Sequence, residues 1–285
     1  MTDIKIDSRA VRPGLKPHPQ IKNIIAVASG KGGVGKSTTA VNLALALAAL
    51  GARVGVLDAD IYGPSQPLML GTQVTPHYES GKALTPVIAH GLESMSMGYL
   101  VDVNTPMVWR GPMVSKALQQ LLFETQWSAL DYLIVDLPPG TGDIQLTMAQ
   151  KIPVAGAIIV TTPQDLALLD ARKGLEMFRK VQIPVLGIIE NMSVHVCTQC
   201  GHEDSIFGTG GGEKIAEATG VPLLGSLPLD KQIREDADGG VPTVIAAPQS
   251  AIAERYRQIA INMLEQLALQ PKSYAGKFPD IVVES

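Results

Sequence analysis

The sequence predicts an α/β fold, with a doubly wound, mostly parallel sheet covered by helices on both faces. Short apolar runs of strand length alternate along the chain with segments of helical periodicity. Hydrophobic residues make up 46% of the chain and aromatic residues only 4%, which suits buried parallel strands better than an aromatic-lined sandwich. A length of 285 residues fits one large domain with appendages better than two independent domains.

The apolar runs and the segments between them place the individual elements. Strands are expected at 24–28, 54–57, 132–135, 157–161, 185–189 and 223–226. Helices are expected at 37–50, 113–124, 143–151, 166–181, 212–218 and 251–269. Asp165 and Ser250 stand where good N-caps are found, just before two of these helices. The stretch 75–97, which contains Pro76 and Pro86, is expected to form an inserted hairpin or loop.

Both ends of the chain lack periodic patterns, which leaves a folded core between them. We expect a disordered N-terminal arm at 1–20, the core at 21–269 and a C-terminal tail at 270–285. A net charge of −4 does not favour tight non-specific binding to nucleic acid. No apolar run reaches the roughly 18 residues of a membrane span, and the N-terminal arm lacks the apolar stretch of a secretory signal. We therefore expect a cytoplasmic protein without nucleic-acid or membrane partners.

One segment matches the pattern G-x-x-x-x-G-K-[ST] of a nucleotide-binding P-loop. Its residues are Gly30, Lys31, Gly32, Gly33, Val34, Gly35, Lys36 and Ser37, followed by Thr38. The segment stands between an expected strand and an expected helix, which is the context that a P-loop requires. Its glycines let backbone N–H groups surround phosphate oxygens, and the helix start adds positive charge. Lys36 is expected to contact the β- and γ-phosphates of ATP, and Ser37 to bind Mg²⁺.

Lys31 lies inside this loop, where an ordinary P-loop needs no lysine. It is either a solvated surface lysine or a cation offered across a two-fold interface to the nucleotide of a partner subunit. In the second case it would act as an arginine finger does. Local chemistry favours neither reading over the other.

Two acidic segments are expected at the carboxyl ends of strands, where open α/β sheets bind ligands. Asp136 ends an apolar run, which is the setting of a Walker-B carboxylate that holds Mg²⁺ or its water. Asp60 follows the strand at 54–57 and is expected to orient or deprotonate the attacking water. For Asp58, a role as a helix or turn cap is nearly as good an explanation as a catalytic role. Asp60 is therefore the preferred catalytic residue.

Cys197 and Cys200 are the only cysteines, and they form a C-x-x-C pair after an expected strand. A structural disulfide between them would be unusual in a reducing cytosol. Zinc knuckles and thioredoxin-like redox sites use the same spacing. A 4Fe-4S cluster takes four thiolates, which two subunits meeting on a two-fold axis would supply together. Zinc would accept the same four sulfurs, so the residues alone leave the metal open.

These motifs together resemble those of a known family. The P-loop with Lys31 is similar to the deviant Walker A motif of the MinD, ParA and nitrogenase iron protein class of dimerising ATPases. The resemblance narrows to the Mrp/ApbC family of iron-sulfur cluster carrier ATPases on four further segments. They are DADIYGPS at 58–65, WRGPM at 109–113, DLPPGTGD at 136–143 and ENMS at 190–193.

The resemblance implies that 21–269 is a P-loop ATPase domain that binds a 4Fe-4S cluster at a homodimer interface. It implies transfer of the cluster to recipient apo iron-sulfur proteins, with cluster scaffold proteins as further partners. Lys31 would reach the phosphates of the partner subunit, and Asp60 and Asp136 would belong to the two switch segments.

The resemblance also implies that Asn191 bonds the adenine edge near Pro228, although the residue pattern alone favours a capping role for Asn191. It favours iron-sulfur over zinc at the cysteine pair. It assigns no role to the segment 109–112. A zinc-stabilised dimeric nucleotide-binding adapter and a MinD/ParA-like positioning ATPase are the alternatives.

Overall fold

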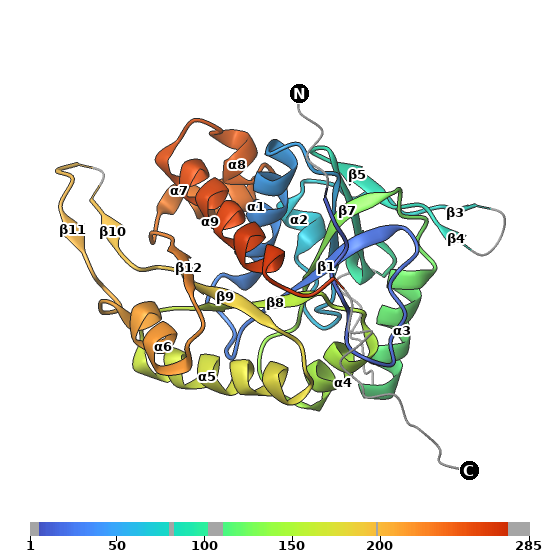
Figure 1. The fold of residues 1–285 in the computed structure, drawn as a ribbon. Coiled ribbons are helices and arrows are strands. Elements are labelled where there is room, and N and C mark those ends of the chain that lie inside the picture. Colours follow the sequence, from blue (N-terminus) through green and yellow to red (C-terminus); the bar gives the residue numbers. More distant parts are fainter. Residues whose placement is uncertain (1–5, 80–82, 102–110, 198, 273–285) are drawn as a thin grey trace, which may run out of the picture.

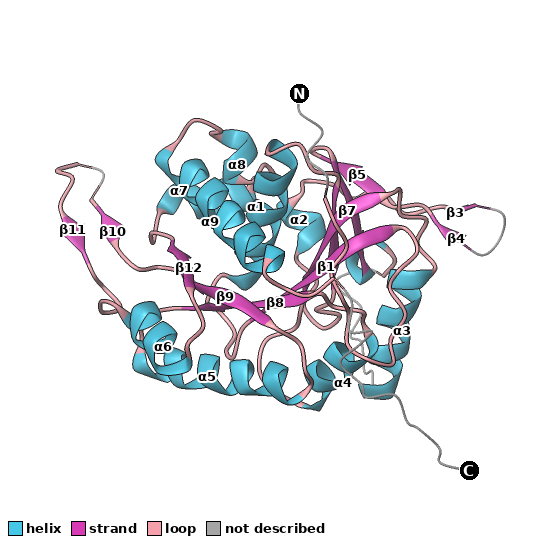
Figure 2. Cartoon of the chain, viewed as in Figure 1, coloured by secondary structure: helices cyan, strands magenta, loops and turns pink. Residues whose placement is uncertain are grey.

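The computed structural model describes residues 6–79, 83–101, 111–197 and 199–272. They contain an eight-stranded sheet in the order β12-β9-β8-β1-β7-β2-β6-β5, which is parallel except for the antiparallel edge strand β5. Helices cover both faces of this sheet (Figures 1 and 2). The predicted fold class is therefore confirmed.

The strands of the large sheet are interspersed with two small hairpins. The sheet contains β1 (Ile21–Ala28), β2 (Val54–Asp58), β5 (Val87–Ala89), β6 (Leu92–Ser96), β7 (Leu130–Asp136), β8 (Gly156–Thr161), β9 (Val185–Glu190) and β12 (Leu223–Ser226). The hairpins pair β3 (Tyr78–Glu79) with β4 (Ala83–Leu84), and β10 (His195–Val196) with β11 (Glu203–Asp204).

The helices form one layer on each face of the sheet (Figure 2). One layer holds α1 (Lys36–Ala49), α2 (Gln66–Met69), α7 (Lys231–Asp238), α8 (Thr243–Ala246) and α9 (Ala251–Ala268). The other holds α3 (Gly111–Phe123), α4 (Asp143–Lys151), α5 (Asp165–Lys180) and α6 (Gly211–Thr219). In the described part of the chain, no helix combines the length and apolar character that crossing a membrane requires.

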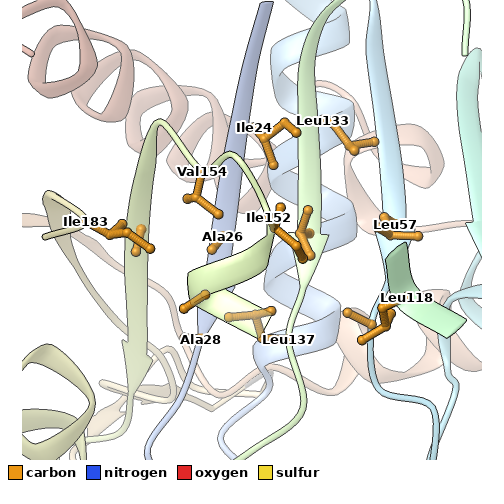
Figure 3. Packing of buried hydrophobic residues seen from close by; sticks show 14 of the residues in the cluster. Ile24, Ala26, Ala28, Leu57, Leu118, Leu133, Leu137, Ile152, Val154 and Ile183 are labelled. Carbon is orange, nitrogen blue, oxygen red and sulfur yellow. The ribbon is translucent and has the colours of Figure 1, made fainter. Parts of the chain in front are cut away.

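The two faces of the sheet pack into separate apolar clusters because side chains alternate along each strand. On β1, Ile24 and Ala26 belong to the cluster under α3 to α6, whereas Ile25 and Val27 belong to the cluster under α1 and α9. Figure 3 shows the first cluster, in which side chains of β1 lie close to Val154. Burial of both faces explains why the strands read as continuous apolar runs.

Every strand and helix named from the sequence is present, with its ends displaced by at most three residues. The inserted stretch 75–97 forms the hairpins β3–β4 and β5–β6, and β6 also joins the main sheet beside β2. Ser250 caps α9, since its side chain accepts a hydrogen bond from the N–H of Ala253 (3.1 Å). The expected cap at Asp165 is wrong, because α5 begins at this residue and Gln164 occupies the cap position.

Residues 6–20 contain neither helix nor strand, and they lie against the start of β1. The N–H of Arg9 donates to Oδ1 of Asn23 (2.9 Å), and His18 is buried and stacks on Phe123, with ring centroids 5.4 Å apart. Disorder of the arm and the division into arm, core and tail stay predictions. Residues 1–5 and 273–285 lie outside the described part of the chain.

Candidate functional site

The P-loop connects β1 to α1 and is shaped by glycines at two close approaches. Gly35 has a φ of +78°, a left-handed backbone that residues with a side chain rarely adopt. A Cβ on Gly30 would lie 2.2 Å from the backbone of Asp170 in α5, so a larger residue would push the loop away from that helix. Gly35 also occupies the N-cap of α1 and has no side chain with which to cap it. The first N–H groups of α1 are therefore left for an anion.

Lys36 and Asp136 form a buried ion pair where the P-loop meets the end of β7. The Nζ and Oδ1 atoms are 2.5 Å apart, and the two side chains are 6% and 0% exposed. The hydroxyl of Ser37 lies 3.2 Å from the same Nζ atom. A buried lysine needs such a partner, and ATP phosphates would offer it another. The fold thus brings together the predicted phosphate lysine and both predicted Mg²⁺ ligands.

Gln66, at the start of α2, is a site residue that the sequence reading missed. Its Nε2 donates to Oδ2 of Asp136 (2.9 Å) and to the carbonyl of Ser37 (3.2 Å). The side chain is fully buried, yet its Oε1 has no hydrogen-bond partner among the described residues. An unpaired amide oxygen beside two candidate ligands fits a site that receives a hydrated cation.

Asp58 organises the loop that follows β2. Its carboxylate accepts hydrogen bonds from the N–H groups of Asp60 (3.1 Å), Ser65 (2.9 Å) and Gln66 (3.1 Å), and from the hydroxyl of Ser96 (3.1 Å). Burial raises the pKa of Asp58 to about 7, with the charge of Asp136 adding to the rise and the three N–H groups opposing it. These contacts fit the structural role that the sequence allowed for Asp58.

Asp60 stands after this turn and is only partly buried. Burial raises the pKa of its carboxyl, although the ammonium of Lys36 and the N–H of Gly63, which donates to Oδ1 (3.2 Å), work against the rise. A raised pKa suits a carboxylate that must accept a proton, which is the role predicted for Asp60.

A cavity of about 670 Å³ opens between the segments that follow β2 and β7. Asp60 and Tyr62 line one side, Pro139 and Gln145 line the other, and Val114 of α3 lies between them. In the predicted segment at 109–112, Trp109 and Arg110 lie outside the described residues. The two predicted switch segments therefore face a common space beside the P-loop.

Asn191 directly follows β9 and reaches the P-loop. Its Nδ2 donates to the carbonyl of Val34 (2.9 Å), and its side chain is buried. Pro228 is buried in the segment after β12, where the carbonyl of Leu227 accepts hydrogen bonds from Ser193. Asn191 thus contacts the phosphate loop, whereas the segment of Pro228 contacts the chain that follows Asn191. The contact of either residue with adenine stays a prediction.

The cysteine pair lies at the end of the β10–β11 hairpin, which projects beyond the sheet (Figure 1). The N–H of Cys197 donates to the carbonyl of His202, and the N–H of Gly201 donates to the carbonyl of Cys197, both at 2.9 Å. The N–H groups of Cys200 and then Gln199 lower the pKa of the Cys197 thiol. Turns of this kind aim backbone N–H groups at sulfur and favour the thiolate, which is the form that binds metal.

Both thiols are free, and Cys200 is exposed. Within residues 6–79, 83–101, 111–197 and 199–272, no group of three or more His, Cys, Asp or Glu side chains could hold a metal ion. The hairpin therefore carries two free thiols within one turn.

Comparison with known proteins identifies the family. The model of the family described as NUBPL iron-transfer P-loop NTPase (ParA) matches residues 20–264. This chain belongs to that family. Membership of this P-loop NTPase family implies ATPase activity, and the resemblance inferred from the motifs is confirmed.

Curated relatives of the iron-transfer P-loop NTPase family match most of the chain. An iron-sulfur cluster carrier protein of Pseudomonas fragi is 64% identical over 257 residues, which cover 90% of this chain and 88% of the relative. The protein of the same description from Escherichia coli K12 is 61% identical, with 93% and 72% covered. The mouse iron-sulfur cluster transfer protein NUBPL is 50% identical, with 91% and 82% covered.

Solved structures with this P-loop NTPase fold agree with the architecture. A nucleotide-binding protein from Archaeoglobus fulgidus, in complex with ADP, has a TM-score of 0.68 and 36% identity, with 78% of this chain and 87% of that chain covered. The cell division ATPase MinD of Pyrococcus furiosus has a TM-score of 0.61 and 23% identity, with 85% and 98% covered. The second likeness concerns the fold alone.

Proposed function

We propose that this chain is an ATP-dependent iron-sulfur cluster carrier that acts in the cytoplasm. Two subunits would hold a 4Fe-4S cluster between their cysteine hairpins, receive it from scaffold proteins and pass it to apo iron-sulfur proteins. The observation that carries the proposal is the pair of adjacent free thiols on an exposed hairpin of an iron-transfer P-loop NTPase.

The ligand count supports a cluster that is shared between subunits. A 4Fe-4S cluster is held by four thiolates, and one chain has only Cys197 and Cys200. Two hairpins related by a two-fold axis would complete the set. A cargo held by two exposed pairs is also open to attack by the thiols of a recipient, which suits a carrier.

The surface around the P-loop supports a face-to-face dimer. Lys31 is exposed and lines a cavity together with Gln164, just before α5. Tyr62, Leu166 and Leu169 are 51%, 59% and 52% exposed, although each has a large apolar side chain. Leu166 and Leu169 stand three positions apart on α5 and so share one face of that helix. Contiguous exposed apolar surface is typical of an interaction face. Burying them against a second copy would bring Lys31 towards the partner's phosphates.

The nucleotide chemistry is assigned to the residues gathered at the end of β7. Ser37 and Asp136 would hold Mg²⁺, which neutralises phosphate charge, and Lys36 would exchange its pairing with Asp136 for the β- and γ-phosphates. Asp60 would orient the attacking water and accept its proton. Lys31 of the partner subunit would stabilise the charge that develops during transfer.

Anaerobic reconstitution with iron and sulfide tests the cluster site. The native chain should bind four irons and four sulfides per dimer, and the Cys197→Ala, Cys200→Ala double variant should bind neither. Circular dichroism should show that the variant folds, since both residues lie at an outlying hairpin. Equal iron and sulfide contents in the two proteins would show that Cys197 and Cys200 do not hold the cluster.

Light scattering tests the dimer. We expect the mass of a dimer when ATP and the cluster are both present. A strictly monomeric species under these conditions would contradict the bridging arrangement.

A zinc-stabilised dimeric adapter is the second candidate, because the hydrogen-bonded C-x-x-C turn also suits zinc. Metal analysis of anaerobically purified protein separates the two candidates. Zinc without sulfide, together with nucleotide binding but no turnover, would favour the adapter. The likeness to MinD concerns the fold and carries no argument for a positioning role.

A further inference from the structure

Both ends of the cysteine hairpin, defined here as residues 193–206, lie beside the P-loop. The chain enters it through Met192 and leaves it through Phe207. These two residues line a cavity of about 120 Å³ on whose other side lie Lys31, Gly32, Gly33 and Val34. The two ends of the segment that carries the thiols therefore lie across one small cavity from the P-loop.

Asn191 makes the entrance a direct connection. Its backbone N–H donates to the carbonyl of Thr161 (2.7 Å), and its side-chain amide donates to the carbonyl of Val34 (2.9 Å). No space separates this amide from the loop, since a Cβ on Gly35 would lie 2.2 Å from its Nδ2. The same Cβ would lie 3.8 Å from Cε of Met192. A shift at Val34 or Gly35 therefore acts directly on the Asn191 side chain, next to which Met192 follows in the chain.

Met192 has an unusual backbone at this point. Among the described residues, three other than glycine have a positive φ, namely His90 (49°), Gln182 (60°) and Met192 (58°). His90 lies in the turn between β5 and β6, and Gln182 lies in the turn between α5 and β9. Of these three, only Met192 lies between a P-loop contact and the hairpin. The left-handed region is disfavoured for a side chain such as methionine, and such outliers gather at functional hinges.

Beyond Met192, the first arm of the hairpin is fastened to the segment after β12. The N–H of Ser193 donates to the carbonyl of Leu227 (3.0 Å), and the N–H of Leu229 donates to the carbonyl of Val194 (2.8 Å). The ring Nδ1 of His195 lies 3.0 Å from the carbonyl of Leu229. The N–H of Leu227 in turn donates to the carbonyl of Glu190 (2.8 Å), so this segment also bonds the arm to the end of β9. Met192 is the one residue between Asn191 and the attached arm, and it forms the joint between them.

We propose that Asn191 and Met192 are positioning residues that set the cysteine hairpin according to the nucleotide in the P-loop. The inference deepens the proposed function, on which it rests for the meaning of the hairpin as the cluster site. Nucleotide that fills the loop changes the path of its backbone, the Asn191 amide follows the carbonyl of Val34, and the strained joint at Met192 turns the hairpin. The thiols then change their exposure and their distance from a second hairpin.

Thiol reactivity of the metal-free protein measures this coupling without a cluster. Cys197 and Cys200 are the only thiols in the chain, so a chromogenic disulfide reagent reports on the hairpin alone. We expect saturating ATP with Mg²⁺ to change the reaction rate of the native protein about fivefold or more, the lower range of measured couplings between sites. Met192→Gly, which relieves the left-handed strain, and Asn191→Ala, which cuts the bond to Val34, should bring the ratio of the two rates close to one.

Gln182→Gly is the matched control, because it relieves the same strain at a turn that does not lead from the P-loop to the hairpin. This variant should keep the native ratio. Binding of a fluorescent ATP analogue, measured for each variant, ensures that rates are compared at saturation. A native ratio in Met192→Gly, or no ATP effect in the native protein, would overturn the inference.

The same proteins separate this inference from the proposed function. If ATP changes the thiol reactivity of a protein that takes up no iron and sulfide, the proposed cluster-carrier function is wrong and the coupling of the P-loop to the hairpin stands. If the protein takes up a cluster but ATP does not change the reactivity of its thiols, the coupling is wrong and the proposed function stands.

Discussion

Strand β7 carries a buried aspartate near each of its ends, and the two carboxylates are held in different ways. At the start of the strand, Asp131 accepts hydrogen bonds from Lys22 Nζ (2.8 Å) and from the backbone N–H (2.9 Å) and Nε (3.3 Å) of Arg53. The side chains of Lys22 and Arg53 are 39% and 55% exposed. The Asp131 carboxylate is thus paired with cations that are themselves in contact with solvent, and both of its oxygens accept hydrogen bonds.

At the end of the strand, Asp136 is bonded by side chains that are buried in the protein interior. Its partners Lys36 and Gln66 are themselves buried, and the Oε1 of Gln66 lacks a hydrogen-bond partner among the described residues. Asp58 lies beside it on β2 with its pKa raised to about 7, chiefly by burial. Folding alone would not gather so many charges and an unpaired oxygen at one place. From this difference we expect the start of β7 to serve stability and its end to serve binding and catalysis.

Replacing the two aspartates in turn is the strongest test of this contrast. Asp136→Asn removes the charge that would hold Mg²⁺ and leaves Lys36 without its partner. We expect the rate of ATP hydrolysis to fall about 100-fold or more, measured as phosphate release at saturating Mg²⁺ and ATP. Asp131→Asn should keep the native rate. Similar rates in the two variants would mean that the ends of β7 do not differ in function.

Asp131→Asn should instead lower the free energy of unfolding, by about 1–3 kcal/mol at neutral pH, because hydrogen bonds to charged groups are lost. Burial disfavours the Asp131 carboxylate, but the bonds from Lys22 and Arg53 outweigh burial and lower its pKa. A lowered folded pKa gives stability that is complete above the usual aspartate pKa of about 3.9 and is lost as pH falls towards the folded pKa. Denaturant unfolding at pH 7 and below pH 4 should therefore show the two proteins converging in acid. A constant difference across this range would exclude the ion pairs as its source.

The sequence located those candidate site residues whose place in the fold follows from local pattern, and their roles stay predictions. Lys36 and Ser37 stand in a contiguous motif between a strand and a helix, and Asp136 ends an apolar run. Each of these signals lies within a few residues, and parallel strands bring their carboxyl ends to one edge whatever the rest of the fold does. Similar reasoning predicted the main strands and longer helices.

The remaining features depend on contacts between distant parts of the chain. Gln66 follows a turn-like segment and meets Asp136 across 70 positions, and Asn191 meets Val34 across 157. Strand β6 lies in a stretch rich in turn residues and is fixed by its pairing with β2. Helix α8 has only four residues, too few for a helical period to show. For Gln66, Asn191 and β6, the decisive partner is adjacent in space only after folding.

Gln66→Leu tests a residue that only the structure revealed. The apolar side chain fills the same space but no longer holds the Asp136 carboxylate and the Ser37 carbonyl. We expect the Mg²⁺ concentration for half-maximal ATP hydrolysis to rise about fivefold, the effect of one hydrogen bond. Titration of activity with Mg²⁺ at fixed ATP measures it. A purely structural role would lower the unfolding free energy and leave the Mg²⁺ titration unchanged.

Lys22→Met should have the smallest effect of the four substitutions. Its effect on the free energy of unfolding tests whether the start of β7 tolerates the loss of one of its two cations. Lys22 is partly exposed, so water screens its attraction for Asp131 and replaces it readily when it is lost. We expect the free energy of unfolding to fall by about 0.2–1 kcal/mol, measured with urea, since Arg53 still satisfies the carboxylate. Water cannot replace Lys36 in the same way, because Asp136 is fully buried and solvent does not reach this ion pair. An effect of Lys22→Met as large as that of Asp131→Asn would show that one lysine alone holds the Asp131 carboxylate, and the contrast between exposed and buried partners would fail.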